Sequence, residues 1–515
     1  MQAKILWADD EIDLLKPHIL FLESKGYTVK TVNNGNDAID KSSEEHFDII
    51  FLDENMPGIS GLEALTKIKE EKPLVPVVMI TKSEEESIME EAIGGKIADY
   101  LIKPVNPNQI LLCIKKNLDH LKLISEKTNS NYQQEFRQLS MQMGGRLDID
   151  EWMELYQKLV YWELELDKIE DKGMQEILKM QKKEANTLFS KFIEKNYLDW
   201  VNGDDDAPEM IQNIIKNKVA PLLGKEKVFF IVIDNLRYDQ WKVLQPNISK
   251  YFNVEEEELV SSILPTATHY ARNALFAGLM PSEIEKKFPK LWLNEDDEGG
   301  KNMHEKEFLE ANLQRLGKNI KFSYNKITNH EAGRKLVDNF SQLKDNDLNV
   351  IVYNFVDMLS HARTEMEMIR ELAEDERAYR SLTVSWFEHS PLLDIFKKVA
   401  DAKIKIVITT DHGTIKVTNP VKIVGDKATN TNLRYKVGKN LSYNEKEVFK
   451  VRNPQDAFLP KTNVSSEFVF TKENDFFVYP NNLNHFVNYY SNTFQHGGIS
   501  LEEMLIPFIV LTPKK

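Results

Sequence analysis

Short apolar runs that lead directly to an aspartate are the feature that most constrains this chain of 515 residues. Near its start such runs lead to Asp9 and Asp53, and in its second half they lead to Asp234, Asp357 and Asp411. Apolar runs of about four to eight residues are typical of buried strands. The carboxyl ends of parallel strands form the ligand-binding edge of an α/β sheet. The pattern therefore predicts two α/β regions, each with acidic side chains at one sheet edge.

The composition is that of a soluble globular protein, with 42% hydrophobic and 29% charged residues. It excludes a disordered chain, a collagen-like repeat and a small disulfide scaffold. Charged residues interrupt every stretch long enough to cross a membrane, so we expect no membrane span, and the first residues are too polar for a secretory signal. Cys113 is the only cysteine, which excludes an intrachain disulfide and favours a cytoplasmic location.

The net charge of −15 is unevenly distributed along the chain. Residues 1–120 contain 13 Lys, no Arg and 22 acidic residues, residues 121–222 contain 14 basic and 19 acidic residues, and residues 223–515 contain 39 and 40. The acidic first part repels nucleic acid at long range, whereas the nearly neutral last part does not exclude an anionic substrate. Since no Lys/Arg-rich run or DNA-binding helix motif is present, we expect no direct binding to duplex DNA.

The length predicts about three domains at roughly 100 to 200 residues per domain. Residues 1–120 alternate strands and amphipathic helices, which favours a flavodoxin-like, doubly wound parallel sheet. Residues 121–222 have long stretches of helical periodicity and predict an antiparallel helical bundle, with helices Leu147–Met174 and Gln175–Trp200.

Residues 223–515 return to an α/β pattern, interrupted by two long stretches, about 282–341 and 415–492, that we expect to form a cap over the strand ends. The predicted strands of the first and last domains are Ala3–Ala8, Thr28–Val32, Ile49–Leu52, Val75–Ile80, Asp99–Ile102, Val228–Ile233, Val350–Phe355, Ile404–Thr409 and Met504–Leu511.

The first candidate site lies at the strand ends of residues 1–120. Asp9 and Asp10 follow the first predicted strand, Asp53 the third, Thr81 the fourth and Lys103 the fifth. Carboxylates gathered in one pocket repel each other unless a hard cation such as Mg²⁺ lies among them. A lysine ammonium and a threonine hydroxyl can bind phosphoryl oxygens, so the set predicts phosphoryl transfer onto Asp53.

Four segments carry a resemblance to the receiver domain of two-component response regulators: Leu6–Glu11, Asp53–Gly58, Thr81 and Tyr100–Pro104. The resemblance implies that a sensor histidine kinase phosphorylates Asp53 and that the receiver binds Mg²⁺. In full, it implies Mg²⁺ ligands at Asp9, Asp10 and the Asn55 carbonyl, a switch pair at Thr81 and Tyr100, and the phosphate-binding lysine at Lys103. We expect phosphorylation to create a new face from residues 84–120 that promotes a homodimer.

The second candidate site is a cluster of metal-ligand residue types in the second half of the chain. Its members lie at or near predicted strand ends and are Asp234, Asp357, His361, Asp411, His412 and His496. Three Asp and three His suit two metal ions with three protein ligands each and open positions, which is the pattern of a catalytic centre. Histidine with carboxylate favours Zn²⁺, and Mn²⁺ and Fe²⁺ remain alternatives.

A threonine at the start of a predicted helix is the candidate nucleophile of this site. Thr268 precedes the helical stretch His269–Leu279, where it is either an N-cap or a group that faces an anion at the helix N-terminus. Arg272, one turn on, either faces a phosphate or is an exposed helix arginine, and Asn235 beside Asp234 either touches substrate or is structural.

The same half of the chain resembles the alkaline phosphatase superfamily, and more narrowly its PglZ-type domain. The segments that carry the resemblance are Ile233–Asp239, Pro265–Asn273, Thr410–Gly413 and His496–Met504. By this resemblance Asp357, His361 and His496 hold one zinc ion, and Asp234, Asp411, His412 and the Thr268 oxygen hold the other. Thr268 is preferred to Thr266 as nucleophile because its spacing to Gly278 is similar to that in related diesterases, and Thr266 stays an alternative.

The order of receiver, helical bundle and PglZ-type domain resembles response regulators of the PorX type, which are associated with type IX secretion. The resemblance implies a zinc-dependent phosphodiesterase, acting on small nucleotides or oligonucleotides, whose activity Asp53 phosphorylation controls. It also implies type IX secretion motor proteins or a sigma factor as protein partners. The alternative is a signalling scaffold, in which the metal domain binds protein partners without essential catalysis.

Overall fold

The computed structural model describes residues 3–73, 75–82, 97–169, 171–295, 297–359, 375–426, 429–461, 463, 465–481 and 483–514. The chain divides into two compact units, Met1–Gln133 and Gln134–Lys515. Most of the predicted helical bundle therefore belongs to the same compact unit as the last domain. No helix in these ranges has the length and apolarity that a membrane span requires.

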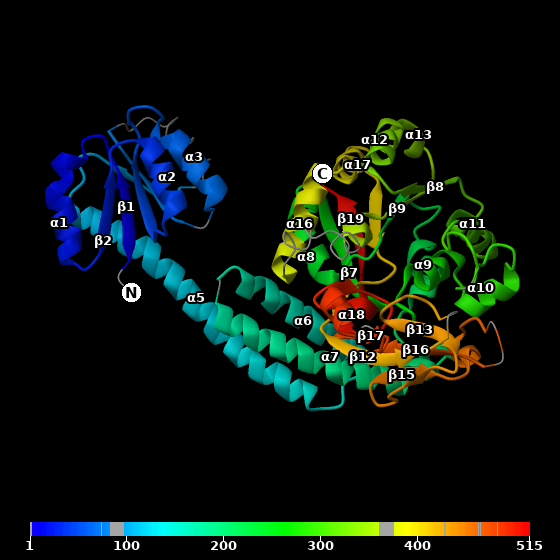
Figure 1. The fold of residues 1–515 in the computed structure, drawn as a ribbon. Coiled ribbons are helices and arrows are strands. Elements are labelled where there is room, and N and C mark those ends of the chain that lie inside the picture. Colours follow the sequence, from blue (N-terminus) through cyan, green and yellow to red (C-terminus); the bar gives the residue numbers. More distant parts are fainter. Residues whose placement is uncertain are drawn as a thin grey trace. The chain divides into compact units, whose positions relative to one another are not determined.

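The first unit contains a five-stranded parallel sheet with the order β2-β1-β3-β4-β5 (Figure 1). Its strands are β1 (Lys4–Ala8), β2 (Thr28–Val32), β3 (Ile49–Asp53), β4 (Val77–Thr81) and β5 (Asp99–Ile102), and its helices include α1 (Lys16–Ser24), α2 (Gly35–Glu44) and α3 (Gly61–Glu71). The central strands β3 and β4 are wholly buried, as their apolar sequences dictate. This strand order confirms the flavodoxin-like fold. Part of the stretch expected to alternate strands and helices, residues 83–96, lies outside the described residues.

Three long helices follow: α5 (Pro107–Met143), α6 (Ile149–Asp167) and α7 (Lys172–Val201). Asp148 and Glu151 form a capping box at the start of α6, and Asp171 caps the start of α7. The predicted break between these two helices, after Met174, is thus a few residues too late, because Asp171 starts the second helix. After α7 the chain forms only short turns, η2 (Ile211–Asn213) and η3 (Ile215–Val219), before the next sheet.

The second unit is built around a six-stranded sheet with the order β7-β19-β10-β6-β9-β8. Strands β10, β6, β9 and β8 are parallel, and β19 runs antiparallel between β10 and β7. Their bounds are β6 (Val228–Ile233), β7 (Phe252–Ser261), β8 (Phe322–Ile327), β9 (Leu348–Tyr353), β10 (Lys405–Thr409) and β19 (Leu505–Pro513).

Helices cover both faces of this sheet, with α8 and α16 on one side and α9 to α11 on the other (Figure 1). The helices named are α8 (Tyr238–Ile248), α9 (Thr268–Ala277), α10 (Pro281–Lys287), α11 (Glu305–Arg315) and α16 (Glu376–His389), with α17 (Pro391–Asp401) packed on β10 and β19. The sheet is therefore the middle layer of a three-layer α/β domain, and the carboxyl ends of β6, β9 and β10 lie at one edge.

The two stretches expected to form a cap have different structures. Within residues 415–495 the strands form small sheets of their own, β11-β18, β14-β12-β17 and β13-β16-β15. The bounds of these strands are β11 (Ile415–Lys416), β12 (Asn419–Val424), β13 (Tyr435–Lys439), β14 (Ser442–Tyr443), β15 (Val448–Val451), β16 (Ser466–Thr471), β17 (Asp475–Val478) and β18 (Phe494–Gln495). The stretch 282–341, in contrast, contributes β8 to the edge of the central sheet, so the expectation of a cap does not hold for that strand. The sequence Phe322–Ile327 is only partly buried and contains polar residues, which hid this edge strand from a search for apolar runs.

Candidate functional site

The receiver pocket brings together the residues predicted for it. Carboxylate oxygens of Asp9, Asp10 and Asp53 lie within 4.8 Å of one another. Lys103 Nζ lies 2.9 Å from both Asp9 Oδ2 and Asp53 Oδ1. Burial raises the pKa of Asp53 to about 6, and its contact with Lys103 opposes that shift. Asp9 and Asp53 are buried and Asp10 is exposed, so the cluster of carboxylates is open on one side. It is a suitable place for a divalent cation and an incoming phosphoryl group.

The other receiver residues lie around this pocket. Thr81, at the end of β4, donates a hydrogen bond to a carboxylate oxygen of Glu54. Lys103 and Pro104 are joined by a cis peptide bond directly after β5. Asn55 is exposed and Tyr100 is half-buried. Of the predicted switch pair, Thr81 ends β4, next to the strand that ends at the predicted acceptor Asp53, and Tyr100 lies within β5.

The second pocket is formed where β6, β9 and β10 end. Asp234 directly follows β6, Asp411 and His412 follow β10, and Asp357 lies four residues beyond the end of β9. Ligand atoms of Asp234, Asp411 and His412 lie within 4.8 Å of one another, and all three residues are buried. The in-register parallel pairing of the three strands brings these side chains together, although they are far apart in the sequence.

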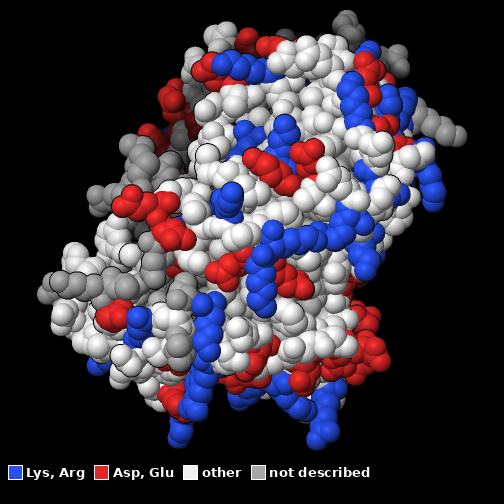
Figure 2. Space-filling view, turned by 90° about the vertical axis from the view of Figure 1, so that its right-hand side faces the viewer, with Lys and Arg blue, Asp and Glu red and all other residues white. Residues whose placement is uncertain are grey.

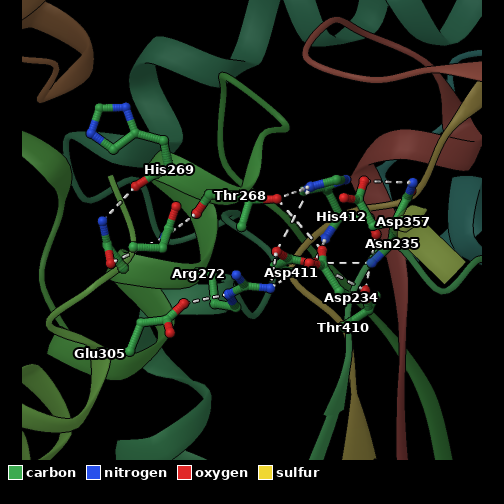
Figure 3. Close-up of polar contacts among 12 residues, drawn as sticks. Asp234, Asn235, Thr268, His269, Arg272, Glu305, Asp357, Thr410, Asp411 and His412 are labelled. Carbon is green, nitrogen blue, oxygen red and sulfur yellow. Dashed lines mark hydrogen bonds and ion pairs between the residues drawn. The ribbon is translucent and has the colours of Figure 1, made fainter. Parts of the chain in front are cut away.

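Thr268 completes this first ligand set (Figure 3). Its Oγ1 lies 3.1 Å from His412 Nε2 and 3.5 Å from Asp234 Oδ1. Thr268 is the first residue of α9, and the N-cap residue is Ala267, so the reading of Thr268 as an N-cap is wrong. Within the buried run from Leu259 to Ala277, Thr268 is the residue that stays partly exposed. Its hydroxyl is thus held against the predicted ligand set by a residue that is partly open to solvent.

Thr266 has a different environment. Its side chain is fully buried, where Oγ1 donates to the Gly498 carbonyl at 2.8 Å and accepts from the Gly497 amide at 3.0 Å. These bonds hold the loop that carries His496 against the start of α9. The geometry gives Thr266 a role in loop structure and leaves Thr268 as the threonine at the metal-ligand cluster.

The second ligand set lies beside the first. His496 Nε2 lies 3.9 Å from Asp357 Oδ1, and the His496 ring stacks on the His412 ring with a centroid separation of 4.2 Å. Asn235 lies between the sets, since its backbone N–H donates to Asp411 at 3.2 Å and its side-chain amide to Asp357 at 3.5 Å. His361, predicted as a third ligand of this set, lies outside the described residues.

The structure contradicts both alternatives that the sequence left open for Arg272. This residue is neither an exposed helix arginine nor open to a substrate, because only 1% of its surface is exposed. Its guanidinium donates to Asp234 Oδ2 at 2.6 Å and to Glu305 Oε1 at 2.5 Å (Figure 3). Asn235 is also fully buried, against two predicted ligands.

Sequence reasoning missed several residues that shape the site. Thr410 Oγ1 accepts from the Leu236 amide at 3.0 Å and donates to the His412 carbonyl at 2.9 Å. These bonds join the turn after Asp234 to the turn that carries Asp411 and His412. Gly413 follows, and a Cβ at that position would overlap the backbone carbonyl of Glu502. Thr410 and Gly413 flank the Asp411-His412 pair in sequence, which was the available signal, whereas Glu305 has no such signal.

The donor set fits a divalent metal ion. Asp411 Oδ2 is buried and receives no hydrogen bond from the described residues. Burial raises the pKa of Asp234 and of Asp411, with Arg272 opposing the shift in both cases. A bound cation would satisfy the orphaned oxygen and favour the ionised carboxylates, and imidazole with carboxylate suits zinc.

The surface of the chain is mixed in charge on the face that Figure 2 shows. Lys and Arg are interspersed there with Asp and Glu rather than gathered into one large area of a single sign (Figure 2). This agrees with the nearly balanced charge of residues 223–515.

Family models match three consecutive parts of the chain. A response regulator receiver domain matches residues 5–115, a PorX response regulator linker domain matches 122–201, and a BREX system PglZ alkaline phosphatase-like domain matches 214–511. The chain belongs to the PglZ family. It has the PorX-type architecture, so it is a two-component response regulator with a phosphoesterase-like PglZ output domain.

Curated relatives match the receiver part. The transcriptional regulatory protein ResD of Bacillus subtilis is 34% identical over 114 residues, which are 22% of this chain and 47% of that protein. The alginate biosynthesis transcriptional regulatory protein AlgB of Pseudomonas syringae is 34% identical over 118 residues, 23% of this chain and 26% of that protein. The chain thus spans less than half the length of these relatives.

A solved CheY-like receiver domain protein from Methanospirillum hungatei is 28% identical and covers 23% of this chain and 96% of its own, with a TM-score of 0.23.

Proposed function

We propose that the PglZ domain of this response regulator is a zinc-dependent phosphodiesterase that acts on small nucleotides or oligonucleotides, under the control of Asp53 phosphorylation. The observation that carries the proposal is the position of Thr268, a partly exposed residue whose hydroxyl lies 3.1 Å from His412 Nε2 and 3.5 Å from Asp234 Oδ1. A hydroxyl held against two metal-ligand side chains at a helix N-terminus is well placed for attack on phosphorus.

The chemistry follows from the groups around Thr268. The N-terminal amides and dipole of α9 favour an anionic phosphate at that end of the helix. The Thr268 oxygen attacks phosphorus, the bond to the leaving alcohol breaks, and water then hydrolyses the phosphothreonine. Two zinc ions, held by Asp234, Asp411, His412 and Thr268 and by Asp357, His361 and His496, would stabilise the charge on the entering and leaving oxygens.

Substrate and partners rest on the resemblance to PorX-type regulators and PglZ domains. The nearly neutral output domain lets an anionic nucleotide approach without long-range repulsion. A link to type IX secretion, with motor proteins or a sigma factor as partners and a cytoplasmic location, belongs to the same proposal. Mg²⁺ in the receiver, bound by Asp9, Asp10, Asp53 and the Asn55 carbonyl, would support phosphorylation of Asp53.

The test combines metal analysis with the turnover of chromogenic phosphomonoesters and phosphodiesters. We expect the wild-type protein to bind about two zinc ions and to hydrolyse the diester. Thr268→Ala should fold, because the residue is not the N-cap, and should retain zinc through Asp234, Asp411 and His412, while turnover falls by several orders of magnitude. Thr268→Ser should keep measurable activity because an equivalent oxygen remains.

Three other outcomes would change the proposal. Loss of turnover in Thr266→Ala with full turnover in Thr268→Ala would move the nucleophile to Thr266. Full activity in both variants would make water the direct nucleophile. Wild-type protein without metal-dependent turnover would favour the signalling scaffold.

A further inference from the structure

A buried chain of charged side chains runs from Glu305 on α11 through Arg272 on α9 to Asp234 at the end of β6 (Figure 3). Each of the three residues is 1% exposed. Charges this deeply buried are stable only when they are paired, so their partners show what each group is for.

Arg272 is held from two sides and cannot swing towards a substrate. Its Nε donates to Glu305 Oε1 at 2.5 Å, and its Nη1 donates to Asp234 Oδ2 at 2.6 Å. The other Asp234 oxygen, Oδ1, faces Thr268. Arg272 therefore occupies one oxygen of Asp234 and leaves the other directed at the metal-ligand set.

Glu305 is in turn fixed by two groups on β8. Its Oε2 accepts hydrogen bonds from Tyr324 OH at 2.5 Å and from Lys326 Nζ at 2.9 Å. Burial alone would raise the pKa of Glu305, but Arg272 and Lys326 outweigh that effect and lower it, so Glu305 is an anion. The edge strand that was expected to be part of a cap thus supports the site from behind.

The charges around Arg272 determine how strongly its guanidinium binds the predicted ligand carboxylates. Arg272 Nη1 also lies 3.7 Å from Asp411 Oδ2, within reach of a second predicted ligand. The Glu305 carboxylate draws the guanidinium away from Asp411. Without that negative charge, Arg272 would bind both ligand carboxylates more strongly and compete with a metal ion for them.

We infer that Arg272 and Glu305 are positioning residues that set the metal affinity of the Asp234–Asp411–His412 site, and that Arg272 does not bind the substrate phosphate. This inference rests on the proposed function, because it requires zinc at that site. Residues that orient metal ligands from behind typically change metal affinity by about 10- to 100-fold when they are replaced.

The test measures the two zinc affinities of the full-length protein by competition with a chromophoric chelator. Glu305→Gln should weaken one zinc site by about 10- to 100-fold and leave the other unchanged, and excess zinc should restore its occupancy. The matched control is Glu163→Gln, since Glu163 is also buried and bonded to an arginine, Arg380, at 2.8 Å, but contacts none of the proposed ligands. The control should keep both wild-type affinities.

Lys326→Gln is a second variant, for which we expect tighter rather than weaker zinc binding. Lys326 is 26% exposed at its side chain and should tolerate replacement. Removing this cation leaves the cluster more negative, so zinc should bind a few-fold more tightly. Weaker zinc binding in Lys326→Gln, or wild-type affinities in folded Glu305→Gln, would overturn the inference. A wild-type protein that binds no zinc through Asp234 and His412 would instead refute the proposed function.

Discussion

The imidazoles of His412 and His496 stack on each other and yet belong to different proposed ligand sets. His412 lies within 4.8 Å of Asp234 and Asp411, whereas His496 lies 3.9 Å from Asp357. Such closeness suits two metal ions that act on one phosphoryl group, since the two sites would share a single substrate.

Replacing either histidine alone should therefore lower the occupancy of a different zinc ion in each case. We expect His412→Ala to lower the occupancy of one zinc and His496→Ala that of the other, each partially, because the remaining ligands leave a weak site. Metal analysis of the purified variants provides the measurement. The control is His46→Ala, because His46 is an exposed residue of the other compact unit, Met1–Gln133. Full zinc content in both ligand variants would refute the assignment.

At single residues, sequence reasoning worked where a side chain follows a buried strand. Asp234 and Asp411 were found in this way because parallel strands bring their ends to one edge. It failed for Arg272, whose burial depends on Glu305 from a helix 33 positions away in the sequence. The choice between Thr266 and Thr268 likewise needed the loop contacts that bury Thr266.

Among the helices and strands, the linker helices are joined to the PglZ domain by buried ion pairs. Glu163 on α6 bonds Arg380 on α16 at 2.8 Å and Lys182 on α7 at 2.6 Å. Lys182 also lies 3.4 Å from Glu502, which is next to the loop of His496. Burial alone would raise the pKa of Glu163, but Lys182 and Arg380 outweigh it and lower it to about 2.

Glu163→Gln should therefore destabilise the second unit, because it leaves buried cations without their anion. A cost of roughly 3 to 5 kcal/mol at neutral pH is expected for breaking such a pair. Since the folded pKa of Glu163 is below its usual value of 4.5, its contribution is present above pH 4.5 and is lost as pH falls towards about 2.

Urea unfolding of wild type and variant at pH 7 and at about pH 3 provides the check. The difference in unfolding free energy should shrink at the lower pH. An equal difference at both pH values would show that Glu163 stabilises the unit by packing rather than by charge.

The success of strand prediction depended on whether a strand is buried on both faces or lies at the edge of the sheet. Strands buried on both faces, such as β6 and β10, were placed to within a residue because they are continuous apolar runs. The edge strands β7 and β8 were missed, because β7 contains the acidic run Glu255–Glu258 and β8 contains several polar residues. Edge strands carry charge to avoid pairing with other chains, which removes the apolar signal.

For the whole molecule, the order of the three parts could be read from the sequence. The strand-end aspartates marked both α/β domains, and the change to helical periodicity marked the linker between them. The compact units were less predictable, because the linker helices carry their own helical pattern while their buried charges pair with residues from α16 and α19 (Leu501–Met504). Pairing over such sequence distances leaves no local signal.

The remaining prediction concerns assembly under the control of Asp53. The face expected to form on phosphorylation spans residues 84–120, of which 84–96 lie outside the described residues. Within the described part, Leu112 on α5 is 66% exposed and Ile102 at the end of β5 is 37% exposed. Exposed apolar side chains at the end of β5 and on α5 suit an interface that becomes favourable when the switch residues rearrange.

Beryllofluoride, which mimics the acyl phosphate on Asp53, should therefore double the mass measured by light scattering at micromolar concentration. Leu112→Glu should prevent the doubling, because a charge buried at the interface is costly. Leu20→Glu on α1 is the matched control, since Leu20 is 64% exposed and lies outside the proposed face. An unchanged wild-type mass would contradict the dimer while leaving the receiver assignment intact. Doubling in Leu112→Glu would place the interface elsewhere.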